Sequence, residues 1–227
     1  MKLAFSHRWD LPVKEAKAVQ SQLAERVITE TTFDPVAVET VAGLDVGFRG
    51  GLARAAVVVL SLPDLVPVDC AVYEEAVTFP YVPGLLAFRE GPPVLGALEK
   101  LTVWPDLFAF DAHGLAHPRR IGLASHIGAI LDQPTIGCAK SRLIGTHGEP
   151  GDAVGDWTPL RDQDETVGAV VRSRSGVKPV YVSIGHRVDL STSVDFVLRC
   201  TKGYRLPETT RLAHQLAGGA ELPIRRS

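Results

Sequence analysis

The sequence predicts an α/β fold in which a mixed sheet, three antiparallel strands and then parallel strands, is flanked by helices. Three apolar segments between residues 38 and 77 are separated only by the short turn sequences RGG and LPDL, which is typical of consecutive antiparallel strands. Between residues 92 and 140, helical and strand-like segments alternate, which is typical of parallel strands joined by helices. The length of 227 residues suits one large domain, so we expect residues 1–227 to form a single domain.

The first predicted element is an amphipathic helix over residues 13–30. Its apolar side chains recur at helical spacing and are Val13, Ala16, Val19, Leu23 and Val27. Among the three strands that follow, the unbroken apolar run 57–60 indicates a central strand covered on both faces. A short helical segment is expected after Pro83, and a further helix over 92–101 has its prolines near its start.

The second half of the chain alternates between strands and helices before a final helical pair. The stretch 145–164 is rich in Gly, Asp and Pro and predicts a loop. The predicted elements, in chain order, are a strand ending at Asp111, a helix over 119–132, a strand over 134–140, a hairpin of 166–173 with 178–185, and helices over 191–200 and 207–217.

The composition excludes several classes of protein. Hydrophobic residues make up 45% of the chain and charged residues 22%, which is typical of a globular protein with a substantial core. No apolar run approaches the ~18 residues of a membrane span, and the N-terminus lacks a signal-peptide pattern, so we expect a cytoplasmic protein without a membrane partner. Cys70, Cys138 and Cys200 occur singly, which argues against a zinc ribbon or a disulfide framework.

The net charge of −2 argues against indiscriminate binding of polyanions, but basic residues cluster locally. The clusters lie near turns and read HPRR at 117–120, AKSR at 139–142, GHR at 185–187 and RCTKGYR at 199–205. Any one of them fits a solvated surface. Four of them near glycine- or proline-rich turns suggest a local basic patch more strongly than any one does.

Asp45 is the first candidate site residue. In a strand over AGLDVGF its side chain shares a face with Gly43 and Gly47, so a ligand backbone can approach closely there. The alternative is a hairpin aspartate paired with a neighbouring arginine.

Asp111 is the second candidate, because it ends a buried strand and ligands of open α/β sheets gather at the carboxyl ends of strands. The alternative is a helix cap, but the loop AHGLAHP follows instead of a helix. Lys140 directly follows the next parallel strand and would bring a positive charge to the same edge.

His113 and His117 are four residues apart, but Gly114 and Pro118 argue against the helix that a zinc site would need. His117, followed by two arginines, is better explained as a hydrogen-bonding or acid–base residue. Glu90 lies on the short helical segment and alone could be a surface glutamate. Carboxylates without cysteine ligands suit Mg²⁺ or Mn²⁺, and with a lysine they suit phosphodiester hydrolysis.

Six motifs occur in a fixed order along the chain, and on them it resembles the endonuclease V family of deoxyinosine 3′-endonucleases. The motifs are AGLDVGF, FPYVPGLLAFRE, FAFDAHGLAHPRRIGLASHIG, TIGCAKSRLIG, SIGHRVDL and KGYRLPETTRLAH. The resemblance covers the chain after about residue 15. It implies an RNase H-like fold with a five-stranded core sheet, and Mg²⁺-dependent cleavage of the second phosphodiester bond 3′ to a deaminated purine in DNA. Mn²⁺ is expected to substitute, and inosine-containing RNA is a further implied substrate.

The resemblance also implies roles for individual residues. Asp45, Asp111 and Glu90 match the metal-binding acidic residues, His214 matches a histidine at the edge of that cluster, and Lys140 and His117 match residues of the catalytic centre. Tyr81 matches the wedge aromatic of a lesion-sensing loop that includes Pro80, Pro83 and Gly84. Contacts to the DNA backbone are expected from Arg119, Arg120, Arg142 and Arg187.

One position departs from the family pattern, which commonly reads DGHG where this chain has Ala112 after the aspartate. If that glycine needs a positive φ, alanine would strain the turn; we expect the change to be tolerated because the aspartate is kept. Two alternatives remain: another RNase H-like nuclease, such as a junction resolvase, and a nucleic-acid-binding module without catalysis. A monomer is expected.

Overall fold

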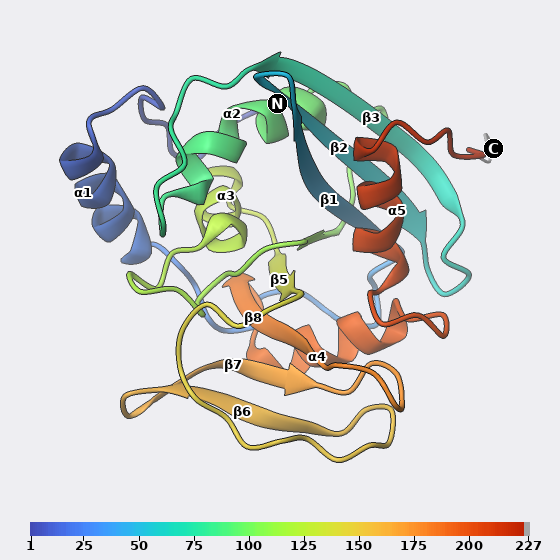
Figure 1. The fold of residues 1–227 in the computed structure, drawn as a ribbon. Coiled ribbons are helices and arrows are strands. Elements are labelled where there is room, and N and C mark those ends of the chain that lie inside the picture. Colours follow the sequence, from blue (N-terminus) through green and yellow to red (C-terminus); the bar gives the residue numbers. More distant parts are fainter. Residues whose placement is uncertain (225–227) are drawn as a thin grey trace.

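The computed structural model describes residues 1–224, and within them the chain forms one eight-stranded sheet with helices on both faces (Figure 1). The strands are β1 (Thr40–Arg49), β2 (Leu52–Ser61), β3 (Pro67–Ala76), β4 (Leu107–Phe110), β5 (Thr135–Ala139), β6 (Trp157–Asp162), β7 (Glu165–Val171) and β8 (Val180–His186). The helices of this region are α1 (Val13–Ala24), α2 (Leu86–Leu98), α3 (Leu123–Leu131), α4 (Leu190–Arg199) and α5 (Glu208–Ala217).

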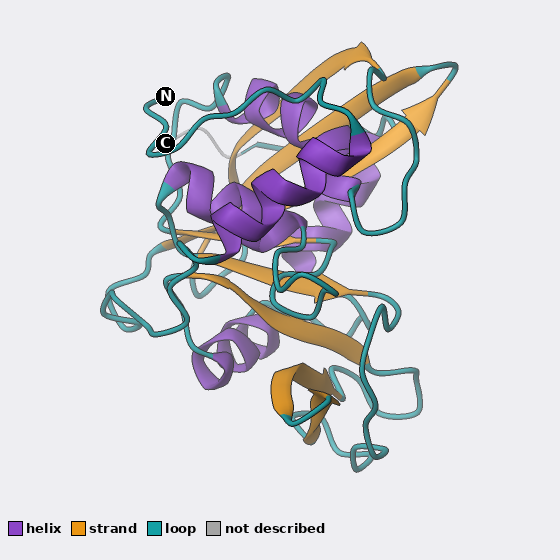
Figure 2. Cartoon of the chain, turned by 90° about the vertical axis from the view of Figure 1, so that its left-hand side faces the viewer, coloured by secondary structure: helices purple, strands orange, loops and turns teal. Residues whose placement is uncertain are grey.

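The sheet order β3-β2-β1-β4-β5-β8-β7-β6 confirms the predicted fold class. β1, β2 and β3 are antiparallel, and β4 and β5 are parallel to β1. Beyond these five strands, β8, β7 and β6 extend the sheet in antiparallel order. Figure 2 shows the long strands β1, β2 and β3 toward the top of the molecule with most of the helices beside them, and β6 and β7 at the bottom.

Two apolar cores cover the two faces of the sheet. Alternate residues of β2 divide between them: Val57 and Val59 pack against α2 and α3, whereas Val58 and Leu60 pack in the core that α4 and α5 complete. The run 57–60 is fully buried, so the prediction of a central strand covered on both faces is confirmed.

Gly43 of β1 makes room for a helix, which corrects the expectation that it clears space for a ligand backbone. A Cβ on Gly43 would lie 1.9 Å from the carbonyl oxygen of Thr209 in α5. A Cβ on Gly47 would lie 3.6 Å from the carbonyl oxygen of Ala217 at the other end of the same helix, which is an ordinary contact. Gly43 therefore lets α5 lie directly against β1, beside Asp45.

Several predicted boundaries were wrong. The first helix ends at Ala24 rather than at residue 30, because the segment beyond it pairs with the end of β8: the Ile28 N–H donates to His186 and the Ile28 carbonyl accepts from the Arg187 N–H. The two helical segments expected after Pro83 are one helix, α2, which contains Pro92 and Pro93 in its interior.

Two more segments differ from the prediction. α3 begins at Leu123 rather than at residue 119, after a turn in which Arg120 has a φ of 56°. The predicted loop 145–164 contains β6, whose Gly- and Asp-rich flanks hid a strand that pairs with β7. Ala112 is not among the residues with positive φ, so this alanine does not strain its turn. Among residues 1–224, none of the helices has the length and apolar character needed to cross a bilayer.

Candidate active site

Three acidic side chains converge at the carboxyl end of β4. Leu44 of β1 is in register with Phe110 of β4, and the Asp111 N–H donates to the Leu44 carbonyl oxygen at 3.1 Å. Asp45 and Asp111 are therefore neighbours on adjacent strands. Glu90 comes from α2, and the three carboxylates line one small cavity.

His214 and Lys140 complete the cluster from two further elements. His214 Nδ1 on α5 donates to Asp45 Oδ2 at 2.7 Å, an arrangement that depends on the close packing of α5 on β1. One ligand atom each from Asp45, Asp111 and His214 lie within 4.8 Å of one another. Lys140, directly after β5, forms an ion pair with Asp111, as expected from the shared edge of two parallel strands.

The electrostatics of the cluster set it apart from an ordinary surface ion pair. Glu90 is 9% exposed, and burial, together with repulsion from Asp45 and Asp111, raises its pKa to about 8. Burial also raises the pKa of Asp111, although Lys140 opposes the shift. These carboxylates are thus held close together at a free-energy cost that a bound cation would offset.

The donor set fits a hard divalent cation. It consists of carboxylate oxygens and one imidazole, and no cysteine of the described chain belongs to it. Lys140 pairs with Asp111 and the exposed His214 with Asp45, and among residues 1–224 Glu90 has no ion pair. Asp45, Asp111 and Glu90, with His214 at the edge, are therefore the residues that could hold a metal.

His117 lies outside the carboxylate cluster and fastens the loop that carries Tyr81. Its Nε2 donates to the Gly84 carbonyl oxygen at 3.0 Å, and its Nδ1 accepts from the Arg119 N–H at 3.2 Å. Burial, together with the nearby Arg119 charge, lowers the pKa of His117 to about 4. His117 is thus a neutral hydrogen-bonding residue between the loop and α3.

The loop itself presents an aromatic side chain beside a pocket. Tyr81 is 72% exposed, between Pro80 and Pro83, and Gly84 has a φ of 77° that favours glycine. A pocket of about 160 Å³ opens behind the loop. Its lining is mostly apolar and includes Val82, Leu86, Ala87, Leu123 and Leu143, with His113 and His117 among them.

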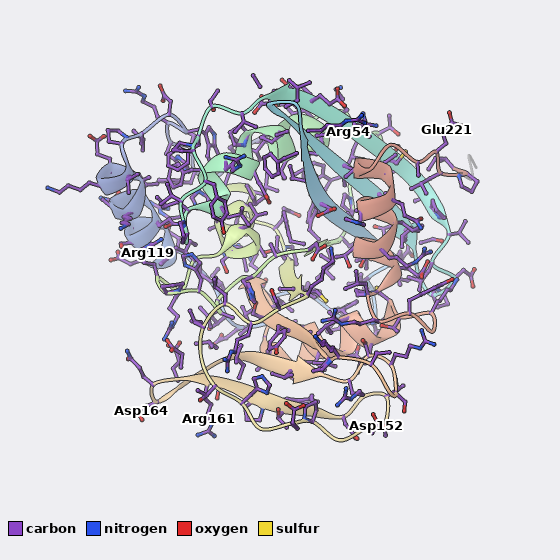
Figure 3. The ribbon with its side chains drawn as sticks, in the orientation of Figure 1. Arg54, Arg119, Asp152, Arg161, Asp164 and Glu221 are labelled. Atoms are coloured by element: carbon purple, nitrogen blue, oxygen red, sulfur yellow. The ribbon has the colours of Figure 1, made fainter. Side chains whose placement is uncertain are left out.

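The predicted backbone-binding arginines do not form one group. Arg119 donates from Nε to Gln20 of α1 at 2.7 Å and also contacts the Gly84 carbonyl, so it supports the loop; Figure 3 shows it beside α1. Arg120 pairs with Asp162 at 2.9 Å and with Glu165 at 2.7 Å, at the turn between β6 and β7.

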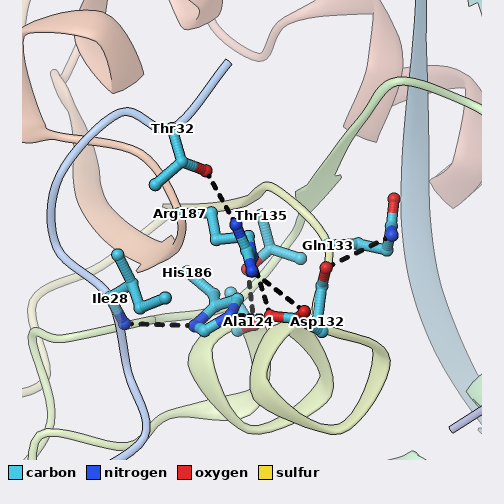
Figure 4. Close-up of polar contacts among 8 residues, drawn as sticks. All are labelled: Ile28, Thr32, Ala124, Asp132, Gln133, Thr135, His186 and Arg187. Carbon is cyan, nitrogen blue, oxygen red and sulfur yellow. Dashed lines mark hydrogen bonds and ion pairs between the residues drawn. The ribbon is translucent and has the colours of Figure 1, made fainter. Parts of the chain in front are cut away.

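Arg187 and Asp111 lie at opposite ends of the central strands. Arg187 follows the end of β8, which pairs with the start of β5, and it is bound by Asp132 (Figure 4). Within residues 1–224, Arg142 is exposed and has no carboxylate partner. Among residues 1–224, Arg142 is the one of these four arginines whose guanidinium has no hydrogen bond or ion pair to the protein, and contact with DNA remains a prediction for all of them.

Sequence reasoning missed two residues that shape the site. His113, set aside as a zinc ligand, lines the pocket and bonds through Nε2 to the Ser141 carbonyl at 2.9 Å, tying the loop after β4 to the loop after β5. Arg89 lies over the Phe48 ring at 4.5 Å and donates to the Phe79 carbonyl at 3.2 Å. Its position beside Glu90 was the signal available in the sequence.

Comparisons with known proteins show which proteins the chain is similar to. The family model described as Endonuclease V matches residues 21–215. The chain is 53% identical over 223 residues to an endonuclease V of Roseiflexus sp. (strain RS-1), covering 98% of this chain and 100% of the relative. The crystal structure of endonuclease V from Streptomyces avermitilis is similar with a TM-score of 0.89 and 45% identity, over 92% of this chain and 93% of that one.

A further similar structure contains nucleic acid. It is the Ciona intestinalis endonuclease V (D234N) in complex with a 23mer DNA containing an inosine followed by a ribo-adenosine. Its TM-score is 0.81 at 30% identity, and the match covers 91% of this chain and 95% of that one.

Proposed function

The chain belongs to the endonuclease V family of deoxyinosine repair endonucleases, and we propose that it hydrolyses the second phosphodiester bond 3′ to a deaminated purine in DNA, deoxyinosine above all. The observation that carries this proposal is the position of the Asp45, Glu90 and Asp111 carboxylates next to the pocket behind the Tyr81 loop. A lesion sensor and a phosphodiester-cleaving centre are thereby joined in one surface.

We assign the metal site to Asp45, Asp111 and Glu90, with His214 at its edge, and propose Mg²⁺ as the ion, with Mn²⁺ able to replace it. A divalent cation supplies an activated water and neutralises charge on the scissile phosphate. His214 orients the Asp45 carboxylate through its 2.7 Å hydrogen bond. Lys140 places a positive charge beside Asp111, where it stabilises the negative charge that develops on the phosphate.

Recognition of the lesion falls to the Tyr81 loop and the pocket. A base must leave the stack before a protein can inspect it, and this costs least for weakly paired bases such as hypoxanthine. The exposed Tyr81 ring is suited to fill the gap in the stack, and Pro80 and Pro83 limit the φ angles around it. The mostly apolar pocket behind Gly84 is suited to the face of the displaced base.

We further propose that inosine-containing RNA is a second substrate; the Ciona intestinalis endonuclease V in complex with a DNA containing an inosine followed by a ribo-adenosine supports this. The protein is proposed to act as a monomer. Residues 1–227 are proposed to form one domain, since the strands β1 to β8 all belong to a single sheet.

The decisive experiment maps the cut on end-labelled DNA and RNA strands that carry one hypoxanthine, with Mg²⁺ and with EDTA. We expect one cut, at the second bond 3′ to the lesion, that needs Mg²⁺ and leaves a 5′-phosphate. A matched strand with adenine and an unmodified four-way junction are the controls. Preferred cleavage of the junction would support a resolvase instead, and binding without cleavage after Mg²⁺ is restored would support a non-catalytic module.

A further inference from the structure

A groove of about 920 Å³ leads away from the carboxylates on the side remote from the lesion pocket. It begins at Asp45, Lys140 and His214 and is lined beyond them by the turn of the β1–β2 hairpin and the end of α5. It is several times larger than the pocket of about 160 Å³ behind the Tyr81 loop. Its size suits an extended chain better than a single base.

The pocket, the carboxylate cavity and the groove form a continuous series. Leu123 lines both the pocket and the cavity, whereas Asp45 and Val46 line both the cavity and the groove. The segment after β5 divides the two ends of this series, since Lys140 lines the groove and Leu143 lines the pocket. A chain that enters the pocket with one base and passes the carboxylates therefore continues into the groove.

The groove wall has the chemistry of a single-strand binding surface. Phe48 is 41% exposed and Leu52 is 45% exposed, and both line the groove beside the polar site. Phe48 is also held by the Arg89 guanidinium at 4.5 Å, which fixes the hairpin to the helix that carries Glu90. An exposed ring held in place is a platform on which any base can stack.

Charge in the groove matches a phosphate backbone. Arg49 is exposed and lines the groove from the other face of β1 than Phe48, and it has no carboxylate partner within residues 1–224. Arg54 lies further along β2 and neutralises Glu74 at 2.5 Å, so this glutamate does not repel an anion. Gly50 and Gly51 form the turn with positive φ, and a Cβ at either would meet no atom within 4 Å, so the turn leaves open space.

We propose that this groove binds the substrate strand on the 3′ side of the cut, with a base on Phe48 and a phosphate on Arg49. The direction follows from the series of cavities. Because cleavage is 3′ to the lesion, the nucleotides beyond the carboxylates are those downstream of the cut. The proposal rests on the proposed function, since it assumes that the lesion base occupies the pocket behind the Tyr81 loop.

The test compares single-stranded oligonucleotides with one deoxyinosine that end either one nucleotide or about eight nucleotides beyond the cut. Binding is measured by fluorescence anisotropy without divalent cations, for the parent, Phe48→Ala and Arg49→Ala. We expect each variant to bind the long strand about tenfold more weakly and the short strand within about twofold of the parent. Arg49→Ala should also lower the salt dependence for the long strand by about one phosphate contact.

The matched control is Arg161→Ala on β6, which Figure 3 places at the opposite end of the molecule from Arg54. It should bind both strands as the parent does. Equal losses on both lengths, or no loss on either, would overturn the proposal. Cleavage of the short strand at deoxyinosine by the parent is measured separately. Its failure would count against the proposed function, and a length-independent effect would count against the groove alone.

Discussion

The two ends of the central strands hold carboxylates in opposite electrostatic surroundings. At one end, Asp132 accepts from Arg187 at 2.7 and 2.9 Å and from His186 at 3.1 Å, and the Arg187 hydrogen bonds lower the pKa of Asp132 (Figure 4). At the other end, burial raises the pKa values of Glu90 and Asp111. The first cluster is satisfied by the protein itself, whereas the second is completed only by something that the fold does not supply.

This difference separates a structural ion pair from a site. The Asp132 cluster ties the segment after α1 to the ends of α3 and β8, since Arg187 also donates to Thr32 at 3.1 Å. The Asp45 cluster contributes little to the stability of the fold, because its like charges repel one another at close range. Residues that disfavour folding in this way are retained where they are needed for binding or catalysis.

The largest expected effect is on catalysis, at the end that holds Asp45, Glu90 and Asp111. Asp111→Asn removes a charge from the metal site, and we expect cleavage to fall by about a hundred- to a thousandfold, with a similar loss for Asp45→Ala. The free energy of unfolding without metal should change little, because repulsion is relieved as the Lys140 pair is lost. Single-turnover cleavage and chemical denaturation measure the two effects. Near-normal cleavage by either variant would exclude the assigned site.

A second readout for the same site is metal binding itself. Mg²⁺ that binds the folded state raises the thermal midpoint of the parent, and Asp111→Asn should show a much smaller rise. This comparison does not depend on activity. An equal rise in parent and variant would place the ion elsewhere.

The next effect concerns pH and the buried His117 beside the Tyr81 loop. Its pKa is about 4 in the fold, against an ordinary value of 6.5, so the unfolded chain takes up a proton first as the pH falls. Stability is therefore full above about pH 6.5 and is lost as the pH falls toward 4. His117 alone should lower the free energy of unfolding by about 2 kcal/mol between about pH 7.5 and pH 5.

Urea denaturation at the two pH values measures this loss. In His117→Gln, whose amide N–H can still donate to the Gly84 carbonyl, the pH dependence should be smaller by that amount. Other buried histidines, among them His126, also have lowered pKa values, so some dependence should remain. An unchanged slope would mean that the pKa of His117 is the same in the folded and the unfolded chain.

How much of the site could be predicted depends on which contacts are local. Asp111 and Lys140 follow parallel strands, so the position of both at one edge follows from the order of elements alone. The position of Glu90 in the site could be predicted only from the family motif, because the spacing of residues in α2 does not indicate that the Glu90 side chain faces β1. The Asp45–His214 bond required the packing of α5, which depends on Gly43, whose role the sequence left ambiguous.

The arginines show most clearly what could not be predicted from the sequence. Arg120 and Arg187 sit in basic clusters that resemble a binding surface, yet their partners lie far away in sequence: Glu165 for Arg120 and Asp132 for Arg187. No local pattern distinguishes a free arginine from one neutralised by a distant strand. The same reasoning failed for β6, because strand pairing with β7 overrode its turn-rich flanks.

A smaller effect is expected for Tyr81→Ala, which removes the exposed ring of the loop. Stacking on one base contributes about 1–3 kcal/mol, so binding to a deoxyinosine duplex should weaken about tenfold or more. Folding should be almost unchanged, because the ring is 72% exposed. Trp157→Ala, an exposed aromatic on β6, is the control and should bind as the parent does. Equal affinities of Tyr81→Ala and parent would argue against a wedge.

The smallest effect tests the end that holds Asp132. Asp132→Asn keeps a residue type that tolerates the φ of 55° at this position but removes the charge that Arg187 and His186 share. Because the pair is partly exposed, we expect a loss of about 1 kcal/mol in the free energy of unfolding, with cleavage per folded molecule unchanged. Urea denaturation and single-turnover cleavage measure these. A large loss of cleavage without loss of stability would contradict the comparison, since Asp132 would then act in the reaction and would not be a structural ion pair.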